Sequence, residues 1–372
     1  MTIRDLVACS LAPPGRRRSA ALRALLIANP DGRPCRIGSS LEQFLAGLVG
    51  DGERPGAAAA RLGREADEAL ARAAAGALEP IGWTDERYPS PLRTIPDPPP
   101  VLWVRGDGSS LRSSQAVAVV GSRAASSYGL SVARQLGHDL ARAGILVVSG
   151  LARGCDGAAH RGALDAGGRT LAVVGCGADV VYPREHRSLG DDVAAAGAIV
   201  SELPPGAPPL PVHFPLRNRI ISGLSAAVVI VEASGRSGSL ITASCALEQG
   251  REVMAVPGSV LSERHTGCHD LLRDGAGLVQ SARDVLEALG WGPAAPRAGA
   301  AGAPADNLEA ASSVAGRGGL LASLAPGEEV DVDALAARSG LKPADLLAEL
   351  TRLELAGAVA RAPGGRFVRS GR

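Results

Sequence analysis

Aromatic residues make up only 2% of this 372-residue chain, so its core must be built from Ala, Val, Leu and Ile. The formal net charge is +1, which gives no overall attraction to nucleic acid and confines any such site to a local patch. The six cysteines are scattered without a C-x-x-C pair, which argues against a disulfide framework. No apolar run approaches the roughly 18 residues of a membrane span, and the N-terminus lacks a signal-peptide pattern. We therefore expect a cytoplasmic protein without a membrane segment.

Composition divides the sequence into five segments: a helical domain (1–80), an extended connector (81–112), an α/β domain (113–290), a linker (291–315) and a winged-helix domain (316–372). Helix formers at 41–49 and 57–78 support the first segment. Prolines throughout 88–107 exclude helix from most of the second. The linker is rich in Pro, Ala and Gly and has no hydrophobic periodicity.

The α/β domain alternates short apolar runs with Gly-rich turns and helical stretches. The runs are nearly continuous in Val, Ile and Ala, as in strands buried on both faces, and lie at 116–120, 145–149, 170–174, 198–201, 227–231 and 252–256. A helix is predicted over 128–144, with one apolar face formed by Leu130, Ala133, Leu136 and Leu140. Strand and helix in alternation predict right-handed βαβ units, and therefore a Rossmann-like, doubly wound, mostly parallel sheet.

The last segment carries a helix, helix, hairpin pattern. Asp331 can cap a helix near 333–340, and Pro343 stands near the start of a second helix. That second helix has one apolar face, formed by Leu346, Leu350 and Leu353, and Gly357 can end it. Two short strands at 358–369 surround the glycine pair at 364–365, which is a hairpin signal. This order predicts a winged helix.

The charges of the predicted winged helix oppose groove binding. Its second helix carries Asp345, Glu349 and Glu354 against Arg352, whereas a helix that enters a DNA groove should be basic. Three arginines on the hairpin leave a wing contact with DNA open: Arg361, Arg366 and Arg369. A protein-binding or regulatory winged helix is an equally open interpretation.

Three Gly-containing loops follow predicted strands, at 121–129, 150–160 and 234–243. In an open parallel sheet such loops line one crevice, where glycines and helix N-termini favour an anion such as phosphate. Arg123 and Arg153 could supply bidentate phosphate contacts. The loops also offer the hydroxyl donors Ser122, Ser237, Ser239 and Thr242. The alternative is that these glycines only permit tight turns, because none of the loops has a Walker or G-x-G-x-x-G pattern.

The segment 213–225 places Arg217, Asn218 and Arg219 before an apolar run. Two arginines and an amide beside the crevice suit a sugar-phosphate backbone, and Phe214 could stack on a base. The alternative is a solvated helix start with Phe214 in the core.

Catalytic patterns are weak in this sequence. Asp156 most simply caps a helix and His160 is typical of a packed histidine. Three glutamates have no local partner: Glu202, Glu232 and Glu248. A metal-like cluster lacks an evident fourth ligand: His265, Cys268 and His269. We therefore expect neither a cofactor nor a metal.

Several motifs, in this order along the chain, resemble the DprA/Smf family of DNA-processing proteins. They are GSR (121–123), SGLARGCDGAAH (149–160), YP (182–183), FPLRNRIISGLS (214–225), SGSLITA (237–243) and ALEQGREVMAVPG (246–258). The proline-rich connector and the last 60 residues also resemble the family's connector and its winged helix. The first 80 residues correspond to its helical, SAM-like domain.

The resemblance implies a non-enzymatic protein that binds single-stranded DNA, protects incoming DNA and helps to load the RecA recombinase during natural transformation and recombination. It also implies a homodimer formed through the Rossmann-like domain, with the dimer and RecA surface around 253–275. Arg123 carries over as a phosphate contact, and Gly121 and Ser122 shape its loop. The other residues that carry over are Arg153, Gly154, Arg217, Asn218, Arg219, Ser237, Gly238 and Ser239.

The sequence departs from the family's pattern at two positions, where Cys155 replaces a usual Ile and His269 a usual Asn. The second change falls near the self-association surface that the resemblance implies. A rival interpretation is a Rossmann-like nucleoside monophosphate hydrolase of the lysine-decarboxylase-like group, with Glu248 assisting glycosidic cleavage. The loop before Glu248 lacks that group's P-G-G-x-G-T order. A scaffold without a ligand would leave the three loops and their arginines unused.

Overall fold

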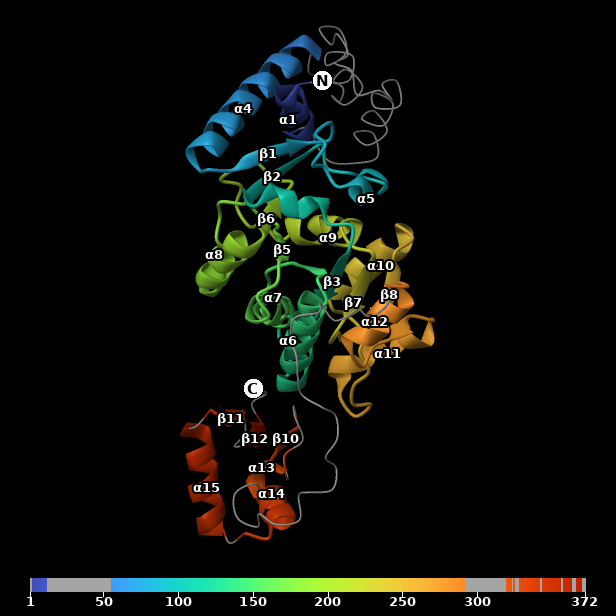
Figure 1. The fold of residues 1–372 in the computed structure, drawn as a ribbon. Coiled ribbons are helices and arrows are strands. Elements are labelled where there is room, and N and C mark those ends of the chain that lie inside the picture. The colour runs from blue at the N-terminus through green and yellow to red at the C-terminus, as the bar shows by residue number, and fades with distance from the viewer. Residues whose placement is uncertain are drawn as a thin grey trace, which may run out of the picture. The chain divides into compact units, whose positions relative to one another are not determined.

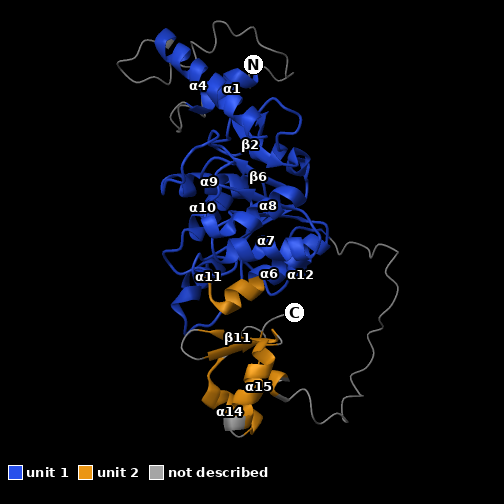
Figure 2. Cartoon of the chain, turned by 90° about the vertical axis from the view of Figure 1, so that its left-hand side faces the viewer, with its two compact units in different colours: residues 1–124, 133–292 blue, residues 125–132, 293–372 orange. Residues whose placement is uncertain are grey.

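The computed structural model describes residues 2–11, 55–291, 319–322, 324, 328–341, 343–355, 357–362 and 366–369 (Figure 1). The chain divides into two compact units, residues 1–124 with 133–292 and residues 125–132 with 293–372 (Figure 2). The helix predicted at 41–49, the linker after Trp291 and the Gly364–Gly365 turn lie outside the described residues. The five domain boundaries stay predictions.

The first unit is built on a nine-stranded sheet in the order β1-β2-β6-β5-β4-β3-β7-β8-β9. Its strands are β1 (Glu79–Gly82), β2 (Val101–Gly106), β3 (Ala116–Val120), β4 (Leu146–Ser149), β5 (Thr170–Val173), β6 (Ala198–Ser201), β7 (Ala227–Ile230), β8 (Glu252–Ala255) and β9 (Gly277–Leu278). Neighbouring strands from β3 to β9 pair in parallel. The predicted doubly wound, mostly parallel sheet is therefore confirmed, and so are its six predicted strands.

The sheet gains an antiparallel edge from the expected connector. β2 pairs antiparallel with β6, and β1 pairs antiparallel with β2. The sequence VLWVRG of β2 is buried over its first four residues, because it continues the sheet instead of crossing its surface. Helices α1 (Ile3–Leu11) and α4 (Pro55–Ala75) lie at this edge, where their apolar residues share a core with Trp103 of β2 (Figure 1).

Helices cover both faces of the parallel strands. Along β5, Leu171 and Val173 belong to one buried cluster and Ala172 to another, so successive side chains fill opposite faces. The connecting elements are α5 (Ser90–Arg93), η1 (Gly108–Arg112), α6 (Ser127–Arg142), α7 (Cys155–Asp165), η2 (Arg184–His186), α8 (Arg187–Ala196), α9 (His213–Gly223), α10 (Ser239–Glu248), η3 (Glu263–His265), α11 (Thr266–Arg273) and α12 (Ala282–Ala288). None of the helices in the described part of the chain is long and apolar enough to cross a bilayer.

The apolar face predicted for α6 is correct in three of its four positions. Ala133, Leu136 and Leu140 are buried, whereas Leu130 is 41% exposed. At 100° per residue the three buried positions fall within about 60° of one another, and Leu130 lies beyond that arc.

The second unit contains the predicted winged helix. Its elements are α13 (Gly319–Ala322), β10 (Glu329–Val330), α14 (Val332–Ser339), α15 (Pro343–Leu355), β11 (Val359–Ala362) and β12 (Arg366–Arg369). Asp331 caps α14 as expected, because its side chain accepts from the Ala334 N–H at 2.7 Å. The predicted leucine face of α15 is buried in a core with Phe367: Leu346, Leu350 and Leu353. The strands pair antiparallel in the order β10-β12-β11.

Candidate nucleic-acid interface

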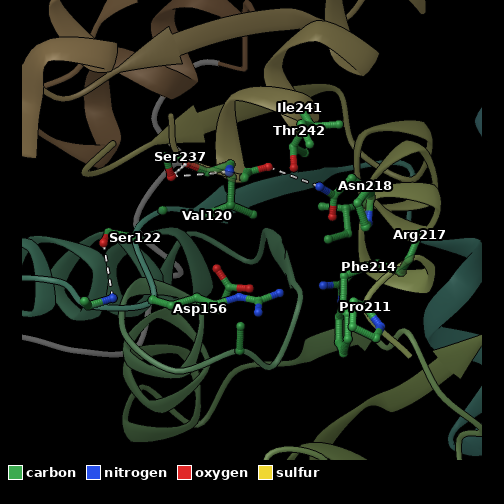
Figure 3. Close-up of a pocket in the computed structure, with 18 of the residues that line it drawn as sticks. Val120, Ser122, Asp156, Pro211, Phe214, Arg217, Asn218, Ser237, Ile241 and Thr242 are labelled. Carbon is green, nitrogen blue, oxygen red and sulfur yellow. Dashed lines mark hydrogen bonds between the residues drawn. The ribbon is translucent and has the colours of Figure 1, made fainter. Parts of the chain in front are cut away.

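A cavity of about 570 Å³ opens at the carboxyl edge of the sheet (Figure 3). The chain runs from β3 to β4 on one side and returns through β7 and β8 on the other, so the connections after β3 and β7 leave in opposite directions. Such a reversal opens a crevice between the loops, which is the usual ligand site of this fold. Figure 3 shows Ser122 and Asp156 on one side of the cavity, Phe214 and Arg217 on the opposite side, and Ser237 with other α10-side residues along a third.

The GSR loop, residues 121–123, is held firmly at its base. The Ser122 N–H donates to the Glu232 carbonyl at 2.7 Å, and the Ser122 carbonyl accepts from the Cys155 N–H at 3.1 Å. Gly121 is required here, because a Cβ atom at this position would lie 2.6 Å from the Cys155 sulfur. The loop is therefore anchored to both β7 and α7.

Arg123 is the exposed cation of this loop. Its guanidinium carbon lies 5.0 Å from the centroid of the Phe214 ring, a cation–π contact. No carboxylate lies within ion-pairing distance of Arg123 among the residues that the structure describes. Phe214 is partly exposed and lines the cavity, so the interpretation that placed it in the core is wrong. Arg123 is thus a positive charge at the cavity that forms no ion pair with the described residues, and Asp156 is an acid of the same lining that interacts with it at longer range.

The second glycine loop shapes the site more than it lines it. Gly154 has φ +76°, and a Cβ atom on it would lie 2.1 Å from the Ser122 carbonyl oxygen. Gly154 therefore packs beneath the GSR loop and is absent from the cavity lining. Arg153 is 65% exposed, forms an ion pair with Glu185, and lines a smaller adjacent cavity of about 230 Å³ together with Arg123 and Phe214.

Arg217 places a second charge in the cavity wall. This residue of α9 is 6% exposed, and its Nη1 donates to the carbonyls of Gly150, at 2.9 Å, and Val173. Burial lowers the pKa of the Arg217 guanidinium to about 10, although the charge of Asp156 opposes the shift. Burial raises the pKa of Asp156, and the Arg217 charge in turn opposes that rise. The Arg217 Nε atom is buried without a hydrogen-bond partner in the described part of the chain.

The two neighbours of Arg217 in sequence have different positions. Asn218 lines the cavity and donates from Nδ2 to the Gly238 carbonyl at 3.3 Å. Arg219 lies outside the lining, because its guanidinium donates to both carboxylate oxygens of Glu202, at 2.9 and 2.8 Å, and to Asp97 at 3.2 Å. The structure therefore brings Asn218, and not Arg219, to the other predicted site residues.

The third loop completes the cavity at the start of α10. Ser237, Gly238, Ser239 and Thr242 all line it, as their loop position predicted. The hydroxyls of Ser237 and Ser239 lie 2.8 Å apart, and the N-terminus of α10 adds a positive dipole end. Sequence reasoning missed Tyr182, whose ring lies 5.3 Å from that of Phe214, and the proline wall at Pro209 and Pro211. The only signal for Tyr182 was its place in the YP motif.

The other polar candidates lie outside this cavity. His160 is fully buried, and its Nδ1 contacts the Thr170 hydroxyl at 2.7 Å. Glu248 is exposed at the last turn of α10 and is not among the lining residues. In the cluster at 265–269, Cys268 Sγ donates to the Ile230 carbonyl and His269 Nε2 contacts the Gly258 carbonyl, so the two side chains have different partners.

Comparison with known proteins covers both units. The family of DNA recombination-mediator protein A matches residues 79–290, and the DprA winged helix domain matches residues 303–365. Protein Smf of Escherichia coli (strain K12) is 45% identical over 286 residues, which cover 75% of this chain and 74% of the relative. The DNA processing protein DprA of Streptococcus pneumoniae is 46% identical over 202 residues, covering 54% of this chain and 71% of the relative.

Solved structures agree with these sequence matches. The X-ray structure of DNA processing protein A from Streptococcus pneumoniae superimposes with a TM-score of 0.67 at 34% identity, covering 77% of this chain and 98% of that one. DNA processing protein A from Helicobacter pylori, whose structure addresses its single-stranded DNA binding mode, gives a TM-score of 0.52 at 28% identity over 57% of this chain and 95% of that one. The chain belongs to the DNA recombination-mediator protein A family, the DprA/Smf family that its motifs resemble.

Proposed function

We propose that this protein binds single-stranded DNA in the cavity at the carboxyl edge of its sheet, with Arg123 as the principal phosphate contact. The observation that carries the proposal is an exposed guanidinium that forms no ion pair with any described residue, mounted on a loop that is hydrogen-bonded at its base. Such a charge neutralises a phosphate without first breaking an ion pair. The single-stranded DNA binding mode described for the Helicobacter pylori relative supports the same ligand.

The rest of the cavity suits a polyanion of flexible shape. Arg217 offsets the charge of Asp156, so the lining near Arg123 is not dominated by an acid. The hydroxyls of Ser237 and Ser239 offer neutral hydrogen bonds, and the Tyr182–Phe214 pair offers an aromatic surface. We expect phosphate contacts to dominate and sequence preference to be slight, because these groups read the backbone and the face of any base.

The protein acts, in this proposal, as a non-enzymatic binder that protects incoming DNA and helps to load the RecA recombinase during natural transformation. The cavity has the size of a small-molecule site, so it holds a short piece of strand, and useful affinity requires a homodimer or a cooperative assembly on one strand. The rival hydrolase would need a general acid at the cavity. Glu248, its candidate, is not in the lining.

Fluorescence anisotropy with labelled oligo-dT and a matching duplex tests the proposal. Replacing Arg123 with Ala should weaken single-strand binding about tenfold and lower the slope of log Kd against log salt by about 0.7, the share of one phosphate contact. Arg134→Ala is the matched control, because Arg134 is an exposed arginine outside the cavity lining. Equal affinities for the two variants would overturn the placement of the site. Release of free base from nucleoside monophosphates would favour the hydrolase.

A further inference from the structure

A second arginine, far along the chain, contacts Ala124, the residue that follows the GSR loop. Arg264 belongs to η3, the short helix between β8 and α11. Its Nη1 donates to the Ala124 carbonyl at 2.5 Å and lies 3.8 Å from the Glu232 Oε1 atom. Arg264 is not among the residues that line either cavity. Its contact with the chain next to Arg123 is therefore made outside the two cavity linings.

Glu232 links this arginine to the base of the same loop. Its side chain is fully buried, and its backbone carbonyl accepts the Ser122 N–H at 2.7 Å. One residue thus holds Ser122 through its backbone and pairs with Arg264 through its carboxylate, while Arg264 holds Ala124. The residues on both sides of Arg123 are anchored in this way, and the Arg123 side chain extends from between two fixed points.

Arg264 itself stands on a segment that is tied to the β7 end of the sheet. The Thr266 hydroxyl accepts from the Gly235 N–H at 3.0 Å, and the Gly267 N–H donates to the Ala233 carbonyl at 2.9 Å. His265 packs so closely on Gly258 that a Cβ atom there would lie 2.1 Å from its ring. The backbone that carries Arg264 is therefore not a free loop, and the contact with Ala124 has a fixed origin.

An exposed ion pair would ordinarily contribute little, and the Arg264 side chain is 55% exposed. This pair differs because its acid is fully buried, and a buried carboxylate needs a charged or hydrogen-bonding partner. The same guanidinium also satisfies a backbone carbonyl. Loss of Arg264 would release the loop and leave Glu232 without this counter-charge.

We propose that Arg264 is a positioning residue for DNA binding: it fixes the loop that presents Arg123 and does not itself contact the strand. The inference rests on the proposed function, because the effect of positioning is read through Arg123. It extends the DNA site to the segment between β8 and α11, which lies outside the cavity.

The test compares Arg264→Ala, Arg264→Lys and the double variant with Arg123→Ala in the full chain, using labelled oligo-dT over a range of salt. We expect Arg264→Ala to weaken binding by up to about tenfold and to lower the salt slope by no more than Arg123→Ala does, since the only phosphate contact affected is that of Arg123. The double variant should bind no more weakly than Arg123→Ala alone, because both changes remove the same contribution. Arg264→Lys should recover most of the affinity. Arg273→Ala is the control, an exposed arginine on the adjacent α11.

Two results would overturn the proposal. Additive losses in the double variant, with a salt slope lower than that of Arg123→Ala alone, would make Arg264 a phosphate contact. Affinity equal to that of Arg273→Ala would remove any role in binding. Backbone hydrogen exchange of peptides containing Ser122–Ala124, measured without DNA, separates this proposal from the proposed function. If exchange is faster in Arg264→Ala but not in Arg273→Ala, Arg264 anchors the loop, even if the protein does not bind oligo-dT. If exchange is unchanged in Arg264→Ala, the proposed anchoring is wrong.

Discussion

The cavity of the large sheet and helices α14 and α15 of the winged helix both carry arginines, but Arg123 of the cavity and the arginines of these two helices have different partners. In the winged helix, Arg338 pairs with Glu328 and Arg352 with Glu349. At the cavity, Arg123 lies over an aromatic ring and forms no ion pair within the described part of the chain. A paired arginine presents little net charge beyond the Debye length, whereas an unpaired one in a concave site attracts phosphate. Whether an arginine is paired with an acid therefore indicates phosphate binding better than the fold in which the arginine lies.

The same contrast holds for the helices that carry each region. α15 occupies the place of a recognition helix, yet three of its four charged residues are acidic: Asp345, Glu349 and Glu354. α10 carries no charged residue in its first turn, and its N-terminal end faces the cavity through Ser239 and Thr242. A phosphate is repelled by the first arrangement and accepted by the second. We expect DNA affinity to follow the cavity.

The largest expected effect comes from a pair of glycines, one in each region. Gly154 has φ +76° and ψ −129°, a conformation that only Gly adopts readily, and it packs on the Ser122 carbonyl. Gly340, which ends α14, has φ +67° and ψ 8° with open space around it. Gly154→Ala should lower the free energy of unfolding by about 3 kcal/mol and abolish most oligo-dT binding, whereas Gly340→Ala should cost about 1 kcal/mol.

Tryptophan fluorescence during urea unfolding measures the first variant, because Trp83, Trp103 and Trp291 all precede the winged helix. Hydrogen exchange of peptides from α14 and α15 measures the second. DNA affinity should be unchanged by Gly340→Ala. A Gly154→Ala protein with normal affinity would mean that the GSR loop does not depend on this close approach.

Histidine titration should make the stability of the first unit, but not that of the winged helix, depend on pH between 5 and 7, because all six histidines precede residue 270. The Thr170 hydroxyl donates to the Val147 carbonyl, so His160 must donate from Nδ1 to Thr170, and its bare Nε2 is buried without a partner in the described residues. Burial lowers the pKa of His160 to about 3, so the folded protein takes up this proton less readily than the unfolded chain. Stability is lost as pH falls below the unfolded value of about 6.5, by about 2 kcal/mol between pH 7 and pH 5.

Urea unfolding of wild type and His160→Gln at the two pH values isolates this contribution. The variant should lose about 2 kcal/mol less than wild type on going from pH 7 to pH 5, whatever its stability at pH 7. Equal losses would show that folding does not lower the pKa of His160.

The strands of the sheet were predictable because burial on both faces leaves a continuous apolar run, as in β6 at 198–201. The antiparallel edge was not. β2 follows a proline-rich stretch, and its partner β6 lies about a hundred residues further along the chain, so no local pattern contains that pairing. The winged helix was predictable because its signals are local in sequence. Asp331 caps a helix that begins at the next residue, and the leucines of α15 repeat along a single helix.

The cavity residues were predictable to the extent that strand ends fix them. Gly121–Arg123 and Ser237–Ser239 meet because β3 and β7 are parallel neighbours. Arg219 was not predictable, because one step along a helix turns a side chain by 100° and its acids, Asp97 and Glu202, are distant in sequence. Arg153 likewise has a partner, Glu185, that lies 32 residues later.

Removing the charge of Glu185, the partner of Arg153, should increase the affinity of the protein for single-stranded DNA. Arg153 and Glu185 are both largely exposed, so their pair is weak and competes with phosphate for the guanidinium. Glu185→Gln should strengthen oligo-dT binding by about threefold and steepen the salt dependence, because it removes a negative charge and frees Arg153. Anisotropy titrations of Glu185→Gln and of Glu185→Gln with Arg153→Ala measure it. A gain that persists without Arg153 would come from the lost charge alone.

The smallest expected effect lies in the wing of the winged helix. Its guanidiniums have local contacts: Arg361 lies 5.3 Å from the centroid of the Phe367 ring, and Arg369 donates to the Leu321 carbonyl at 3.4 Å. Replacing Arg361, Arg366 and Arg369 together with Ala should change oligo-dT affinity by less than about twofold at physiological salt, because exposed surface charges are largely screened. The duplex arm of the same titration decides between the two interpretations of this unit. A selective loss of duplex binding would assign the wing to DNA. Unchanged binding of both ligands would favour a protein partner, which leaves the cavity as the DNA site of the chain.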